Sequence, residues 1–166
     1  MGASEKTKSG RGPRTGPRLV LKMATFCRSI ALEPDTRETS ILGVLPGLKV
    51  KVATLKGTEQ GPFNLSIPLW VYVLFGVEEP PAELTTVEIE AIFELTGQTR
   101  FTNLLNLEIR PGESLSTLNI RVAAPNGIPL IAGIQTFRID FKHNSYAVGT
   151  VEMPITLTIT ASDKLG

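Results

Sequence analysis

The segment TTVEIEAIFEL, residues 85–95, alternates between apolar and mostly acidic positions with a period of two. One face of the segment carries Val87, Ile89, Ala91, Phe93 and Leu95. The other face carries Glu88, Glu90, Ile92 and Glu94. A period of two is typical of a strand with one dry and one hydrated face, as in an antiparallel sheet. In a helix the three glutamates would spread over more than half of the helical wheel, so we predict a strand.

Seven other short runs have the character of strands between turn signals, which indicates an all-β chain. They cover residues 19–32, 41–54, 65–77, 105–109, 118–124, 137–141 and 155–159. We expect Pro46 and Gly47 to bend or split the second run. About eight short strands without a helical segment predict an antiparallel β-sandwich, immunoglobulin-like or similar. A closed barrel is the alternative.

The chain has 166 residues, 42% hydrophobic and 20% charged, which suits one domain with its own core. Residues 1–22 hold six basic side chains and one acidic side chain, a net charge of +5. The rest holds eleven basic and fifteen acidic side chains, a net charge of −4. We therefore expect a disordered basic tail over residues 1–18, a β-sandwich domain over residues 19–161 and a short C-terminal tail over residues 162–166.

The basic tail is the strongest signal outside the predicted core. Its candidate polyanion-binding residues are Lys6, Lys8, Arg11, Arg14 and Arg18. Such a cluster binds phosphates with an affinity that falls steeply with salt. The tail contains no aromatic residue to stack on bases, however. A solubilising extension, or a translation start at Met23 inside the first strand, is therefore the competing interpretation.

The only histidine, His143, stands before Asn144 and Ser145 in the last third of the chain. We predict that Asn144 and Ser145 form the two-residue loop of a hairpin, because asparagine tolerates the positive φ of tight turns. This register places His143 opposite Tyr146. His143 is then a solvated residue at the tip of a hairpin rather than a catalytic base.

The same register predicts the course of the last strand. Phe141 is expected opposite Val148, and a bulge at Gly149 restores the phase of the apolar positions that follow. Pro154 lacks an N–H group, so we predict that the strand is at an edge there or is interrupted.

Side chains for catalysis are sparse. Asp140 is expected on the opposite strand face from His143, which does not suit a Ser-His-Asp arrangement. Cys27 has no activating neighbours in the sequence and is expected to be a half-buried strand cysteine. One histidine, one cysteine and three aspartates do not suit a zinc or calcium site, and no glycine loop for phosphates is present. We expect no metal, no cofactor and no enzymatic activity.

Two further groups of side chains have competing interpretations. Glu88, Glu90 and Glu94 suggest the paired carboxylates of hydrolases, but their spacing along one strand favours a hydrated sheet face. Trp70 and Tyr72 share one face of the apolar run 65–77. We expect both rings to pack in the core, with a binding platform as the alternative.

Four longer segments carry a family resemblance. They are ATFCRSIAL, SILGVLPGLKV, IPLWVYVLFGVEEPPAELTTVEIEAIFELTGQ and GIQTFRIDFKHNSYAVGTVEMPITLTI. Together they span about residues 22–160 and resemble a family of uncharacterised bacterial β-sandwich proteins. The resemblance implies the fold and a bacterial origin but no catalytic residues, because the family has none assigned. IAGIQTF stands where that family has a proline-glycine-tyrosine entry to the penultimate strand.

We predict a non-enzymatic β-sandwich module that acts in the cytoplasm through an unidentified protein partner. A single cysteine cannot form an intrachain disulfide, which fits a reducing compartment. No apolar run reaches the roughly 18 residues that a membrane span requires. The alternative is a nucleic-acid-associated protein that uses the basic tail.

Overall fold

The computed structural model describes residues 16–163, apart from residues 33, 36–37, 58–60, 67–68 and 125. Within these residues the chain is all-β, as predicted, but it forms eleven strands rather than about eight. The strands are β1 (Arg18–Leu32), β2 (Thr39–Val44), β3 (Leu48–Leu55), β4 (Phe63–Leu65), β5 (Leu69–Glu78), β6 (Thr85–Leu95), β7 (Gln98–Ile109), β8 (Leu115–Val122), β9 (Ile128–Leu130), β10 (Gly133–His143) and β11 (Tyr146–Ser162). Most of the predicted tails, residues 1–15 and 164–166, lie outside the described part.

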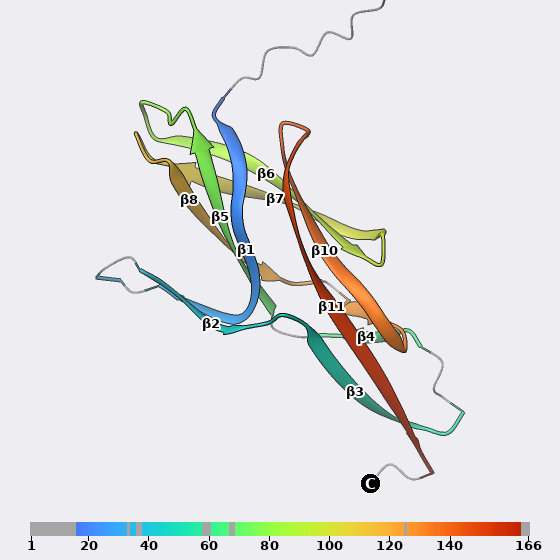
Figure 1. The fold of residues 1–166 in the computed structure, drawn as a ribbon. Coiled ribbons are helices and arrows are strands. Elements are labelled where there is room, and N and C mark those ends of the chain that lie inside the picture. The colour runs from blue at the N-terminus through green and yellow to red at the C-terminus, as the bar shows by residue number, and fades with distance from the viewer. Residues whose placement is uncertain are drawn as a thin grey trace, which may run out of the picture.

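Two larger sheets form two layers with the core between them (Figure 1). One has the strand order β2-β1-β5-β8, and the other has the order β3-β11-β10-β6-β7. The predicted split at Pro46 and Gly47 is confirmed, and residues 45–47 carry the chain from one sheet to the other. The expectation of purely antiparallel pairing is wrong, because β3 pairs with β11 in parallel after this crossing.

The core is built from alternating side chains of both sheets. All five apolar side chains predicted for the dry face of residues 85–95 are buried. The ring centroids of Phe26 in β1 and Phe137 in β10 are 5.8 Å apart. Those of Phe75 in β5 and Phe141 in β10 are 5.9 Å apart. Such tilted and edge-to-face pairs join the two sheets more strongly than burial alone.

A bulge at Lys22 changes the phase of β1. Leu21 pairs with Phe75, whereas Met23 pairs with Leu74, so the partner strand has no residue opposite Lys22. A bulge of this kind lets two neighbouring parts of one strand present different residues to the core. Met23 is consequently turned outward and is 44% exposed.

The bulge in the last hairpin lies at Val148, one residue before the predicted position. Phe141 pairs with Gly149 and not with Val148. The reason is that Gly149 lies against β1, where an added Cβ would come 2.4 Å from the Cβ of Leu21. The residue that pairs with Phe141 therefore has no room for a side chain, and glycine is the residue that fits there.

β11 runs through Pro154 without interruption. Pro154 pairs with Thr136 of β10, while the parallel pairing with β3 begins only at Ile155. The strand is therefore open at Pro154 on the side of β3, which suits a residue without an N–H group. The prediction of a local edge is confirmed, and that of an interruption is wrong.

Candidate functional site

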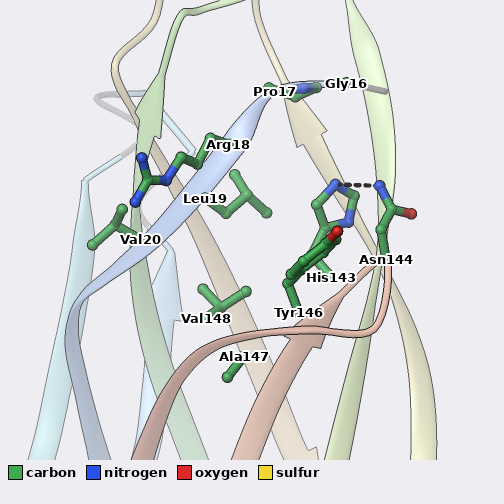
Figure 2. Close-up of a pocket in the computed structure, with 10 residues that line it drawn as sticks. All are labelled: Gly16, Pro17, Arg18, Leu19, Val20, His143, Asn144, Tyr146, Ala147 and Val148. Carbon is green, nitrogen blue, oxygen red and sulfur yellow. Dashed lines mark hydrogen bonds between the residues drawn. The ribbon is translucent and has the colours of Figure 1, made fainter. Parts of the chain in front are cut away.

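A pocket of about 230 Å³ lies between the start of β1 and the β10–β11 hairpin (Figure 2). Its lining residues are Gly16, Pro17, Arg18, Leu19, Val20, His143, Asn144, Tyr146, Ala147 and Val148. The predicted hairpin is confirmed, since Asn144 and Ser145 have φ values of 49° and 64° and His143 pairs with Tyr146. Arg18 extends away from His143 (Figure 2).

His143 is held by two hydrogen bonds, so it is more than the solvated turn residue that we expected. Its Nδ1 lies 3.0 Å from the backbone oxygen of Glu88, and its Nε2 lies 3.2 Å from Nδ2 of Asn144. The Asn144 amide nitrogen is a donor, so Nε2 accepts and the proton on Nδ1 is donated to Glu88. The imidazole thereby ties the hairpin tip to β6.

Among the described residues, no carboxylate hydrogen-bonds to His143 as a catalytic triad requires. Asp140 instead accepts hydrogen bonds from Arg138, whose Nε lies 2.9 Å away, and from the Thr150 hydroxyl. Burial alone raises the pKa of Asp140, but the hydrogen bonds from Arg138 and Thr150 and the charge of Arg138 outweigh it. The pKa of Asp140 is therefore lowered.

We expect Asp140→Asn to lower the free energy of unfolding at neutral pH and to matter less in acid. Because the pKa is lower in the folded state, the ionised carboxylate contributes its stability fully above the unfolded value of about 4. That contribution is lost as the pH falls through the folded value. Urea unfolding of both proteins at neutral pH and at about pH 3 measures this difference. A gap that is constant with pH would contradict the assignment.

Cys27 is fully buried, which exceeds the half burial that we expected, and its Sγ lies 3.7 Å from the backbone oxygen of Trp70. Burial raises the pKa of the Cys27 thiol, so the nucleophilic thiolate is disfavoured. The described part of the chain contains no group of three or more His, Cys, Asp or Glu side chains placed to hold a metal ion. It also has no helix that could cross a membrane.

The predicted polyanion-binding cluster falls almost wholly outside the structure. Four of its five residues lie beyond the described part: Lys6, Lys8, Arg11 and Arg14. The fifth, Arg18, begins β1, and its Nε lies 3.2 Å from Oε2 of Glu78. Both side chains are more than half exposed, so this ion pair adds little to stability.

The outer face of the five-stranded sheet is charged. Glu88, Glu90 and Glu94 all point away from the core on β6, as the prediction of a hydrated face requires. Across the sheet, Arg138 pairs in register with Glu94, and Lys142 pairs with Glu90. Opposite charges at cross-strand positions stabilise a hydrated sheet face. The glutamates therefore need no catalytic explanation.

The outer face of the four-stranded sheet is different. Trp70 and Tyr72 alternate along β5 with Val71 and Val73, and it is the valines that are fully buried. The expectation that the two rings pack in the core is therefore wrong. β5 is apolar on both faces, so its periodicity does not indicate which face turns inward.

We call this outer surface of the four-stranded sheet the apolar face. Its outward side chains are Met23 and Thr25 of β1, Leu42 and Val44 of β2, Trp70, Tyr72 and Leu74 of β5, and Leu115, Thr117 and Asn119 of β8. Cys27 lies on the same side of β1 but is already fully buried by the chain itself. Its most exposed large apolar side chains are Leu42 (53%), Val44 (58%), Leu115 (51%) and Met23 (44%). Apolar patches that span several strands in this way mark interaction sites.

Two cationic side chains border the apolar face near opposite corners. The alkyl stem of Lys22 lies over Gly76, where an added Cβ would come 2.5 Å from Cε of the lysine. Arg121 of β8 pairs in register with Trp70, near the other end of β5. Long basic side chains of this kind cover apolar surface with their stems and keep their charge in water. The centre of the apolar face is uncharged.

Comparison with known proteins does not identify a family for this chain. No family model matches the chain. No curated protein matches it either. Among solved structures, the N-terminal domain of PorA matches over 81% of this chain and 97% of that chain, with 12% identity and a TM-score of 0.24. A likeness at this level carries no argument about function, which therefore has to come from the site itself.

Proposed function

We propose that the chain is a non-enzymatic β-sandwich interaction module that binds a protein partner through its apolar face. The observation that carries this proposal is the contrast between the two outer sheet faces. Charged side chains alternate in sign across one face, where the exposed Leu104 and Ile134 stand apart from each other on β7 and β10. The other face presents Trp70, Tyr72 and Leu74 next to exposed aliphatic residues of the neighbouring strands. A solvated antiparallel sheet is expected to alternate apolar-in and polar-out. An apolar outer face is therefore a surface that a partner covers.

The state of the reactive side chains supports a role without catalysis. His143 donates to a backbone oxygen, Asp140 is paired with Arg138, and Cys27 is buried. Nucleic-acid association through the basic tail stays the alternative, favoured by the charge of +5 over residues 1–22. A cytoplasmic location stays a prediction, for which the unpaired Cys27 is the supporting observation.

A photo-crosslinking amino acid placed on the apolar face tests this function. Thr117 of β8 is exposed on the apolar face, and Thr102 of β7 is exposed on the charged face. Both are threonines on edge strands, so they form a matched pair of sites. We expect irradiation in cells to link the chain to a protein from position 117 and not from position 102. Adducts of equal yield from both sites, or from neither, would contradict the proposal.

A further inference from the structure

We propose that the partner covering the apolar face is a second copy of this chain, packed sheet against sheet about a two-fold axis. This inference rests on the proposed function, because it names the occupant of the same surface. Two sheets that pack face to face lie about 10 Å apart with their strands roughly aligned. A two-fold axis in the plane of the interface places the apolar face of one copy on the apolar face of the other.

The size of the apolar face suits a dimer. Strands lie about 4.8 Å apart and residues advance about 3.4 Å along a strand, so β1, β5 and β8 over the length of β5 cover roughly 500 Å² in projection. β2 pairs with β1 from Cys27 onward and extends the face beyond the end of β5. The accessible surface of side chains exceeds the projected area. Covering the face therefore approaches the roughly 800 Å² per partner of a stable, specific interface. A single added strand along one edge would cover only a fraction of it.

The positions of Lys22 and Arg121 allow the apolar faces of two copies to pack against each other without bringing like charges together. Lys22 lies on β1 at the level of Gly76, while Arg121 lies on β8 at the level of Trp70, the diagonally opposite corner. With a two-fold axis parallel to the strands, or perpendicular to them in the plane of the interface, each corner of one copy faces an adjacent corner of the other copy. No corner faces its own equivalent or the diagonally opposite corner. In both arrangements the like charges of the two copies stay apart, and the uncharged centres meet.

The edge strand β2 is unprotected on the side of the apolar face. Sheet edges are normally protected from other chains by charged residues or proline. β3 carries Lys49 and Lys51, β7 carries Arg100 and Glu108, and β8 carries Arg121. β2, with the sequence TSILGV, carries neither a charge nor a proline, and its Leu42 and Val44 are exposed. A second copy over the apolar face would shield these side chains.

Sedimentation velocity of the full chain over the micromolar range, with two double variants, tests the dimer. Val44→Glu with Leu115→Glu places charges at both lateral edges of the apolar face. Leu104→Glu with Ile134→Glu makes the same change at two residues that are 64% and 76% exposed on the charged face. We expect a wild-type dimer, an unchanged control, and a dissociation constant at least about 100-fold higher for the apolar-face variant. Circular dichroism and thermal melts confirm that both variants are folded.

The outcomes separate this inference from the function on which it rests. A wild-type monomer that still forms Thr117-site adducts with another protein would overturn the second copy and keep the interaction module. A dimer that both double variants preserve would place the interface elsewhere and overturn the inference. A monomer that binds single-stranded RNA, with the binding lost in Trp70→Ala, would make nucleic acid the occupant and overturn the inference as well.

Discussion

Replacing Phe137 with alanine is expected to lower the free energy of unfolding by about 4 kcal/mol, among the largest effects of a single substitution. Phe137 is fully buried, and its ring centroid lies 5.8 Å from that of Phe26 and 6.2 Å from that of Phe93. Phe26 belongs to one sheet and Phe93 to the other. The substitution therefore opens a cavity between the layers and removes a ring that joins them. Urea unfolding measures the loss.

Ile134→Ala is the matched control for this substitution. Ile134 lies three residues earlier on the same strand and is 76% exposed, so its loss should change the free energy of unfolding by no more than about 0.5 kcal/mol. If Phe137→Ala costs no more than this control, the aromatic cluster does not hold the two sheets together, and the core has been assigned to the wrong residues.

The sequence predicts the fold class well because one physical signal dominates it. The alternation over residues 85–95 requires a sheet with one dry face, and all of its predicted core residues are buried. The pairing of strands is a different matter. β3 reaches its place beside β11 through contacts between residues about a hundred positions apart, as in the pair Leu48–Ile155. The alternation of apolar and polar residues within β3 does not indicate which strand it pairs with.

The candidate site was hard to predict for a similar reason. The sequence draws attention to His143 and to the strand glutamates, because polar side chains stand out, yet the structure gives them local roles. The apolar face draws a few residues from each of four strands. Met23 joins it only because the bulge at Lys22 changes the phase of β1, and the side of β5 that bears Trp70 is set by its partners. Such a surface becomes visible only when the strands are paired.

Adding one methyl group at Gly149 is expected to cost about 2–3 kcal/mol of stability. An alanine Cβ at this position would lie 2.4 Å from the Cβ and 2.6 Å from the Cδ2 of Leu21. The Cβ is fixed to the backbone of β1, so no rotation of the leucine side chain relieves the clash. β1 and β11 would have to move apart where the two sheets meet. Thermal or urea unfolding of Gly149→Ala measures the cost.

Gly76→Ala separates this close approach from the general effect of replacing a glycine. Neither Gly76 nor Gly149 has a positive φ, so the backbone of both positions accepts alanine. The nearest atom to the new Cβ of Gly76, 2.5 Å away, is Cε of Lys22, near the free end of a flexible side chain. The lysine can move at little cost, and the lower entropy of the unfolded chain favours alanine, so we expect a change within about 1 kcal/mol of zero. Equal losses in the two variants would show that the contact between Leu21 and Gly149 does not set the packing of β1 on β11.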